Sequence, residues 1–269
     1  MTAPDQQTIS VVISTYERPD ACERALISVL GQTREPLEVL ICDDGSGDET
    51  AERFRDWQQR CKQVRYLSTG ENSGTPACTR NLGIARARGS WVAFLDDDDS
   101  WLPDKLEHQQ TAITAQTADV IATNAWRSDG RAYFPGAPPL LRPARTDLLK
   151  ANPLITSSVL VRRSLVRFPT ARWLRGVEDY AAWLALADGN ARFLVLGEPL
   201  VHYEDVSTDR LSTARFRTEL AITRLAWQRA LRHPRAPGNL TAALRRSAAA
   251  AYVAGGELVG VRSRRGRTV

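Results

Sequence analysis

The chain has 269 residues, with 36 Lys and Arg against 31 Asp and Glu, which leaves a formal net charge of +5. Charged residues make up 25% of the chain and hydrophobic residues 43%, close to an ordinary globular protein. This composition excludes a disordered chain and a fibrous repeat, and the length provides enough core for one large domain or two small ones.

Apolar and amphipathic segments alternate through the first half of the chain. Strands are predicted over residues 9–14, 38–42, 64–68 and 91–95, and helices over 20–30, 48–60 and 75–88. This alternation predicts an α/β domain with a mostly parallel sheet. The carboxyl ends of such strands form a binding crevice, so the loops after the first, second and fourth strands are expected to converge. These loops contain Thr15–Arg18, Asp43-Asp44 and Asp96–Asp99.

The second half is less regular. Strands are predicted over residues 119–124, 158–162, 193–196 and 200–203, and helices over 178–187, 215–232 and 240–253. Four prolines make residues 131–145 an irregular loop. In the 215–232 helix one face carries Phe216, Leu220, Trp227 and Leu231, which predicts that this face docks on the domain.

Asp96–Asp99 is the most informative feature of the sequence. Four consecutive acids repel one another unless a cation or a network of donors is present. Because a hydrophobic strand carries them to its end, we favour a hard-metal site with oxygen ligands over a solvated acidic turn that caps the next helix. An EF-hand is excluded, because Trp101 stands where its loop requires glycine.

The segment after the second predicted strand carries two acids and two glycines. Gly45-Ser46-Gly47 suggests a dinucleotide fingerprint, but Thr50 replaces its third glycine, and two acids stand where a pyrophosphate would approach. We therefore reject that interpretation, and no P-loop sequence is present either. Asp43, at the strand tip, is a candidate to accept a hydrogen bond from a ligand.

Several motifs together resemble family two glycosyltransferases of the GT-A fold. They occur in the family's order over residues 9–213 and comprise ISVVIST with Arg18, Gln32-Thr33, EVLICDDGSGD at 38–48, Asn72-Ser73-Gly74 with Arg80-Asn81, FLDDDDSWLP at 94–103, GVEDY at 176–180 with Trp183-Leu184, and Glu198–Val201 with Tyr203. The resemblance implies a GT-A fold, a Rossmann-like mixed sheet flanked by helices. It also implies transfer of a sugar from a nucleotide-diphosphate donor to an acceptor hydroxyl.

The resemblance assigns the acids of the tetrad to the donor and its metal. A diphosphate leaving group needs a divalent cation, Mn²⁺ or Mg²⁺, which the family binds through an Asp-x-Asp motif. The best match makes Asp98 the metal ligand and places Asp96 on the ribose. Because all four residues are aspartates, the motif can also be aligned on Asp97 and Asp99, and this alternative stays open.

Other matched positions belong to the nucleotide. Asp43 resembles the acid that reads the base, which favours uracil, and Thr15, Tyr16 and Arg18 resemble the base-side loop. Arg80 resembles a contact to the donor phosphate or the base. The family often has asparagine after the tyrosine, where this chain has Glu17, so the nucleotide stays open.

Asp179 is the candidate catalytic base, and Glu178 is expected to orient the acceptor or the base. A hydroxyl must lose its proton as it attacks the anomeric carbon, and a positioned carboxylate can take that proton. In the first helical turn the dipole favours the ionised form, although acids there often serve only as caps. A single base opposite the leaving group implies direct displacement with inversion.

Four further residues are weaker candidates. His202 lies on the closing strand, where some GT-A enzymes supply a third metal ligand, although a partly buried strand histidine is the commoner case. Arg210 is a candidate lid over the diphosphate. Trp101 and Trp173 flank the two acidic motifs and are candidates for stacking on the acceptor sugar, although tryptophan often belongs to the core.

The positive charge is concentrated at the carboxyl end. Residues 215–269 carry 12 Arg and two acids, a net of +10, whereas residues 1–214 carry a net of −5. We therefore expect a GT-A domain over 1–214 and a basic helical extension over 215–269. Docking on the domain is preferred for the helix, and its arginines are also candidates for contact with anionic lipid, which suits a lipid-linked acceptor. Nucleic-acid binding is not expected, because no recognition module is visible.

The sequence also predicts where the protein works. Its cysteines form no close ligand pair, its start lacks the features of a signal peptide, and no stretch has the roughly 20 apolar residues of a spanning helix. We expect a cytoplasmic enzyme, with peripheral contact to the inner membrane face through its tail. The acceptor class, which includes saccharides, lipid-linked glycans and small molecules, stays open, as does assembly into a homo-oligomer.

Two other functions are less compatible with these motifs. A nucleotidyltransferase on a similar sheet would need a basic, glycine-rich loop near the first strand, where this chain has Glu17 and only Arg18. A non-catalytic sugar-binding or nucleotide-binding relative would not need both the tetrad and the Glu178-Asp179 pair.

Overall fold

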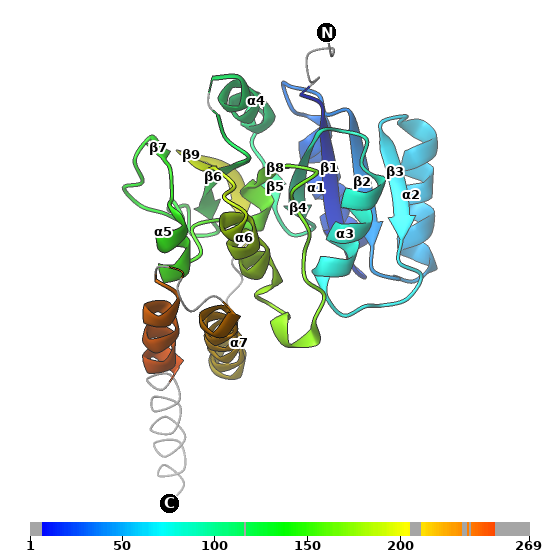
Figure 1. Ribbon diagram of the computed structural model, residues 1–269. Coiled ribbons are helices and arrows are strands. Elements are labelled where there is room, and N and C mark those ends of the chain that lie inside the picture. Colours follow the sequence, from blue (N-terminus) through cyan, green and yellow to red (C-terminus); the bar gives the residue numbers. More distant parts are fainter. Residues whose placement is uncertain (1–6, 116, 205–210, 233–235, 237, 251–269) are drawn as a thin grey trace, which may run out of the picture.

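The computed structural model describes residues 7–115, 117–204, 211–232, 236 and 238–250, with side chains from residue 217 onward in α7. One sheet runs through the domain in the order β3-β2-β1-β4-β8-β6-β9-β5, and β7 pairs with β9 beside this path. Helices cover both faces of the sheet (Figure 1). The chain therefore forms a layered α/β structure.

The first half is a parallel unit. Its strands are β1 (Ile9–Thr15), β2 (Glu38–Asp43), β3 (Val64–Ser68) and β4 (Trp91–Asp96), which alternate with the helices α1 (Pro19–Leu30), α2 (Asp48–Arg60) and α3 (Pro76–Arg86). The pairs β1–β2, β1–β4 and β2–β3 are all parallel. Each of these seven elements lies within two residues of its predicted bounds, and the parallel arrangement of the first half is confirmed.

The second half makes the sheet mixed. Its strands are β5 (Ser100–Trp101), β6 (Val120–Arg127), β7 (Leu140–Leu141), β8 (Leu160–Arg162) and β9 (Phe193–Tyr203), and its helices are α4 (Lys105–Ala115), α5 (Arg145–Lys150), η1 (Thr156–Ser158), η2 (Arg172–Leu174), α6 (Glu178–Asp188) and α7 (Leu211–Arg232). β8 is antiparallel to both β4 and β6, whereas β9 is parallel to β6. The second half contributes five strand pairings, including the one between β8 and β4, and four of the five are antiparallel. The expectation of a mostly parallel sheet therefore holds for the first half alone.

One prediction in the second half is wrong. The segments 193–196 and 200–203 belong to the single strand β9, because two register shifts against β6 absorb the Gly197–Pro199 segment without ending the pairing. The proline-rich 131–145 segment also contains the short strand β7, which lies against β9.

Two hydrophobic clusters lie on opposite faces of the sheet. One packs β-strand side chains such as Val12 and Leu40 against α3, α5 and α6, and the other packs Val11 and Ile41 against α1, α2 and α4. Helix α3 lies close to β1, because a Cβ at Gly83 would stand 2.5 Å from a methyl group of Val12. Both faces are covered, which explains why the strands are continuously apolar rather than alternating.

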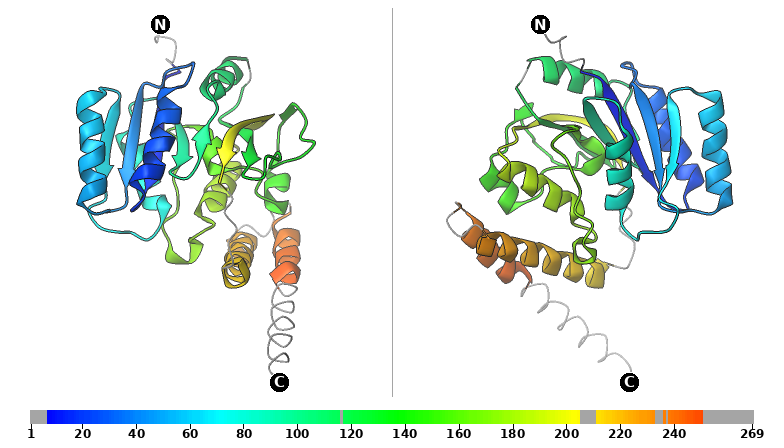
Figure 2. Two further views of the ribbon diagram at one scale, coloured as in Figure 1. Left: turned by 180° about the vertical axis from the view of Figure 1, so that it is seen from behind. Right: turned by 45° about the vertical axis from the view of Figure 1, so that its right-hand side comes forward.

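The carboxyl-terminal helices dock on α5 and α6. Helix α7 and the helix formed by residues 239–250 lie side by side below these elements (Figure 2). Ala221 and Leu225 belong to the main core cluster, and Arg229 pairs with Asp188 of α6 at 2.5 Å. The preferred expectation of docking is therefore confirmed for the described part of the tail.

The docking face agrees with the predicted one at Trp227, which packs against Ala243 of the next helix, and differs from it at the leucines; the side chain of Phe216 lies outside the described part of α7. Leu220 is 46% exposed and Leu231 is 75% exposed, whereas Leu225 and Ala226 are buried. Small residues allow the helices to approach closely, so the alanine-rich face docks and the larger leucines stay outside. None of the helices within the described ranges is long and apolar enough to span a membrane.

Candidate functional site

A cavity of about 400 Å³ opens at the carboxyl ends of β1, β2 and β4. Its lining comes from the loops after β1, β2 and β4, from the loop between β3 and α3, from α3 itself and, with one residue, from the segment before α6. The lining residues are Ser14, Thr15, Tyr16, Arg18, Asp44, Asn72, Gly74, Thr75, Pro76, Thr79, Arg80, Asp96, Asp97, Asp98 and Arg175. The predicted convergence of the three loops is confirmed.

Asp97 and Asp98 are tied to the β1 loop. Thr15 donates a hydrogen bond from Oγ1 to Asp97 at 2.8 Å, and Arg18 lies 3.2 Å from Asp97 and 2.9 Å from Asp98. Asp97 is buried, which raises its pKa to about 6, whereas the Asp98 side chain is 42% exposed. Asp98 is therefore the tetrad acid most accessible to a ligand in the cavity.

Asp99 points away from the cavity into the protein. Its carboxylate accepts hydrogen bonds from the Ser157 hydroxyl of η1 and from the backbone N–H of Glu204. Burial, followed by the nearby charge of Asp96, raises the pKa of Asp99 to about 8. Asp99 therefore supports the loop from inside and is not presented to a ligand, which removes one of the alternative registers.

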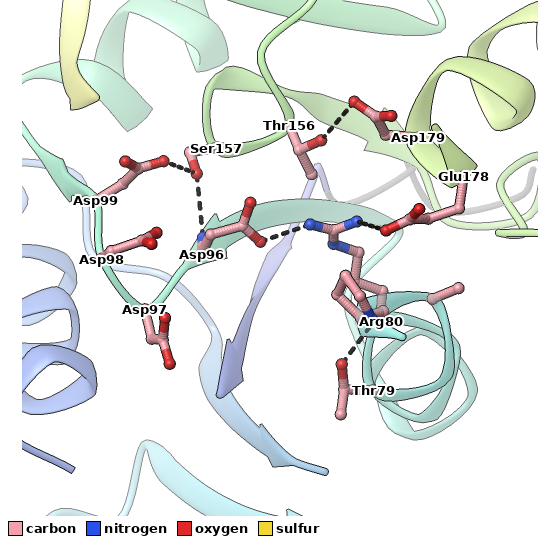
Figure 3. A network of polar contacts seen from close by, with 12 residues as sticks. Thr79, Arg80, Asp96, Asp97, Asp98, Asp99, Thr156, Ser157, Glu178 and Asp179 are labelled. Atoms are coloured by element: carbon pink, nitrogen blue, oxygen red, sulfur yellow. Dashed lines mark hydrogen bonds and ion pairs between the residues drawn. The ribbon is translucent and has the colours of Figure 1, made fainter. Parts of the chain in front are cut away.

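Arg80 links the tetrad to the Glu-Asp pair of α6. Its guanidinium donates to Asp96 at 2.6 Å and lies 3.7 Å from Glu178, and Figure 3 shows it between the two carboxylates. Burial opposes its charge, but the neighbouring carboxylates outweigh that effect and hold the pKa of Arg80 above its usual value. The two acidic motifs, about 80 residues apart in the sequence, therefore share one buried cation.

Asp179 lies in the first turn of α6, as expected. Its carboxylate accepts hydrogen bonds from Tyr180 N at 2.6 Å, Thr156 Oγ1 at 3.3 Å and Asn152 Nδ2 at 3.4 Å (Figure 3 shows the Thr156 contact). Burial raises the pKa of Asp179, and the charge of Arg80 opposes that shift only in part. The expected dipole effect, which favours the ionised form, is therefore outweighed by burial.

The structure separates the two acids that follow β2. Asp43 is fully buried, and its carboxylate accepts bonds from the Ser46 hydroxyl, from Ser46 N at 3.0 Å and from the Tyr66 hydroxyl at 2.8 Å. Asp44 lines the cavity, where it accepts bonds from the Ser73 hydroxyl and the backbone of Ser73 and Gly74. Asp44, and not Asp43, is thus the acid of this loop that a ligand in the cavity meets.

The aromatic candidates for the acceptor are largely packed. Trp101 is 4% exposed, donates to Ser157 O at 2.8 Å and has the Lys105 ammonium 3.7 Å from its ring centre. It therefore offers no ring face to a sugar, which corrects that expectation. Trp173 is half-buried against the core, and Arg224 of α7 covers its ring at 4.5 Å.

His202 and Arg210 do not join the site in the described structure. His202 lies on β9 opposite Ser100 and lines a second cavity of about 450 Å³, whose lining does not include Asp98. Arg210 lies outside the described residues.

Comparisons with known proteins identify the family of this chain. A family model described as "Glycosyl transferase family 2" matches residues 10–167. The chain belongs to glycosyl transferase family 2. It is 30% identical over 203 residues to TuaG of Bacillus subtilis, a glycosyltransferase named for teichuronic acid biosynthesis. The alignment covers 74% of this chain and 79% of TuaG. It is also 28% identical over 189 residues to the glucosyltransferase WfgD of Escherichia coli, over 69% of this chain and 72% of WfgD.

Solved structures show the same fold. TarS of S. aureus superposes with a TM-score of 0.65 at 20% identity, over 83% of this glycosyltransferase and 65% of the TarS chain. The mannosyltransferase PcManGT of Pyrobaculum calidifontis superposes with a TM-score of 0.67 at 19% identity, over 99% of this chain and 78% of that one. The predicted GT-A fold with carboxyl-terminal helices is confirmed.

The cavity offers oxygen ligands that suit a hard cation. Asp96 and Asp98 both line it with carboxylates that are 31% and 42% exposed. Within the described ranges, one cluster brings ligand atoms of three His, Cys, Asp or Glu side chains within 4.8 Å of one another. It consists of Asp104, His108 and Glu198, between α4 and β9. The His108 contacts to Glu198 at 2.7 Å and Asp104 at 3.7 Å account for that cluster without a metal.

Sequence reasoning missed three residues of this site. Thr156 and Ser157 of η1 reach Asp179 and Asp99, but nothing distinguishes them in the sequence from other loop hydroxyls. Arg175 lines the cavity and directly precedes the GVEDY motif. That position is the one sequence feature that pointed to it.

Proposed function

We propose that this glycosyltransferase moves a sugar from a nucleotide-diphosphate donor, a UDP-sugar, to an acceptor hydroxyl with inversion and with a divalent cation. The observation that carries the proposal is the ion-pair chain Asp96–Arg80–Glu178. It joins the carboxylates that suit the donor and its cation to the pair that suits proton removal.

Named relatives support the donor class. TarS has been solved in complex with UDP and with UDP-GlcNAc, and the name of WfgD gives UDP-Glc as its donor. In this chain Thr15, Tyr16 and Asp44 surround the part of the cavity that we assign to the base. Asp44 supplies the hydrogen-bond acceptor there, because it lines the cavity, whereas Asp43 is fully buried and does not belong to the lining.

The cation would be held by Asp98, with Asp96 on the ribose side. Mn²⁺ or Mg²⁺ both accept hard oxygen ligands, and PcManGT has been solved with GDP-Man and Mn²⁺. When bound, the cation neutralises the diphosphate as it leaves. Arg18 contacts Asp98 at 2.9 Å and is 56% exposed, so it can yield this carboxylate to a cation and still keep its contact with Asp97.

We assign proton removal to Asp179. A raised pKa makes its carboxylate a stronger acceptor for the hydroxyl proton at neutral pH than an ordinary aspartate. Glu178 accepts a hydrogen bond from Gly176 N at 2.6 Å and faces Arg80, so it orients the first turn of α6. One base and a leaving group on opposite faces of the sugar correspond to direct displacement.

We also propose a lipid-linked acceptor and peripheral membrane contact. The name of WfgD gives a sugar-diphosphoundecaprenol as its acceptor. On the helix formed by residues 239–250, Leu240 and Leu244 are 55% and 56% exposed, and the exposed Arg245 follows them. Exposed leucines beside arginine suit an anionic bilayer surface. In this view residues 215–269 are an extension that brings the GT-A domain to the inner membrane face.

A screen of nucleotide-sugars tests the proposal. Ligands that bind the folded state raise its melting temperature, so UDP-GlcNAc and UDP-Glc with Mn²⁺ should raise it, and GDP-Man should raise it less. Purified acceptors that carry a lipid diphosphate then test transfer directly. Stabilisation by GDP-Man and not by either UDP-sugar would contradict the assignment of uracil.

A further inference from the structure

The cavity contains three arginines, and two of them are already paired with acids. Arg18 contacts Asp97 and Asp98, and Arg80 contacts Asp96 and Glu178. These guanidinium groups hold the acidic loop together, so an anionic ligand must compete with carboxylates for them. Neither guanidinium can bind a diphosphate without giving up part of its contact with a carboxylate.

Arg175 is the third arginine of the lining, and its setting is different. Its side chain is exposed and has no ion pair or side-chain hydrogen bond with any described residue. Its guanidinium lies beside the loop between β3 and α3. One of its nitrogens is 3.8 Å from the position that a Cβ on Gly74 would take. At that distance the guanidinium lies against the wall of the cavity that the loop between β3 and α3 forms.

The backbone around Arg175 is firmly placed. Leu174 is 4% exposed in the main core, and Trp173 stacks under Arg224 of α7 at 4.5 Å. The short helix η2 is thus fixed from both sides just before Arg175. The backbone of η2 is held in place and the Arg175 side chain is unpaired. The guanidinium therefore breaks no ion pair or hydrogen bond with a described residue when it binds a ligand.

The amino end of α3 adds to the positive potential next to Arg175. Thr75 caps this helix by accepting a hydrogen bond from Ala77 N at 3.3 Å, and Thr75 and Pro76 both line the cavity. Helix amino ends favour anions, and a guanidinium binds two phosphate oxygens at once. The two features converge on the same wall of the cavity.

We propose that Arg175 binds the diphosphate of the nucleotide-sugar donor. This assignment rests on the proposed function, because it takes a nucleoside diphosphate as the ligand. Arg175 is then a donor-binding residue supplied by the segment that leads into α6, and it connects donor binding to the helix that carries Asp179. Arg18 and Arg80 remain with their carboxylates.

The test compares ligands with and without phosphate on matched variants. Affinities for UDP and for uridine are measured by calorimetry with Mn²⁺ on the wild-type chain, on Arg175→Gln and on Arg172→Gln. Arg172 is an exposed arginine of the same η2 segment that does not line the cavity. Loss of one charge-assisted contact predicts about 10-fold weaker UDP binding by Arg175→Gln, with uridine unchanged. Arg172→Gln should match the wild type for both ligands, and Arg175→Lys should recover part of the loss.

Each other result has a defined meaning. Equal UDP affinity in Arg175→Gln and wild type would overturn the assignment, as would an equal loss for UDP and uridine with an unchanged melting temperature. A wild-type chain that binds neither UDP nor any other nucleoside diphosphate would overturn the proposed function together with this inference. Wild-type binding of UDP with an insensitive Arg175→Gln would overturn the inference alone.

Discussion

Replacing Asp179 with asparagine removes the candidate base and changes the shape of the side chain little. The carboxylate accepts bonds from Tyr180 N, Thr156 Oγ1 and Asn152 Nδ2. An asparagine oxygen can keep the bond from Tyr180 N, and the Thr156 hydroxyl can rotate to accept from the new amide. The fold and the donor cavity should therefore survive the substitution.

The expected loss of rate follows from the chemistry of a general base. A positioned base contributes about 10²-fold to 10⁴-fold, which corresponds to about 3–5 kcal/mol of transition-state stabilisation. The raised pKa of Asp179 adds a signature in pH. Its carboxylate accepts the proton only when ionised, so wild-type kcat/KM should fall with decreasing pH at a value above the pH near 4 of an ordinary aspartate.

The assay measures transfer and UDP binding on the same preparations. Asp179→Asn should lose transfer by the stated factor, keep UDP affinity nearly intact and lose the acid limb of the pH profile. Asp56→Asn is the control, because Asp56 forms only an exposed pair with Arg60 on α2. Turnover of Asp179→Asn at the wild-type rate would refute the role of Asp179 as the base.

Three further predictions concern other acids of the domain. Asp98→Ala should reduce the Mn²⁺-dependent affinity for UDP by about 10-fold or more in calorimetry, while binding without metal stays unchanged. Asp44→Asn should weaken UDP binding. Asp43→Asn should chiefly lower stability, by about 1–3 kcal/mol in urea unfolding, because the buried carboxylate that accepts from Ser46 and Tyr66 is lost. Hydrogen bonds from Arg192 hold the pKa of Asp119 below its usual value, so this carboxylate stabilises the fold above the unfolded pKa of about 4 and loses that effect as pH falls through the folded value. Asp119→Asn should therefore unfold about 1–2 kcal/mol more easily at pH 7, and the difference should shrink below pH 4.

The parallel half of the fold could be predicted from the sequence. The strands β1, β2 and β4 are short, mainly apolar runs that end in polar loops, and each helix begins at a proline or directly after a glycine, so local pattern and final structure coincide. The second half depends on contacts between distant segments. Nothing local shows that Phe193–Tyr203 pairs with β6 across two register shifts, because the partner strand supplies the continuity.

The candidate site was predictable by residue type and less so by orientation. The sequence places Asp43 and Asp44 together at a strand end, but which of them faces the cavity depends on Ser46 and Tyr66. Likewise, periodicity alone predicts the large leucines of α7 as the docking face. In the structure Ala221 and Leu225 pack inside instead, whereas Leu220 and Leu231 are exposed.

The central claim is that this glycosyltransferase binds a uridine diphosphate through a cation held by the tetrad. Calorimetric titration of the full chain with UDP, in Mn²⁺ and then in EDTA, tests it most directly. We predict binding in Mn²⁺ that weakens at least about 10-fold in EDTA, as expected when a divalent cation bridges Asp98 and the diphosphate. Equal affinity in both conditions, or no binding of UDP in either, would contradict the account.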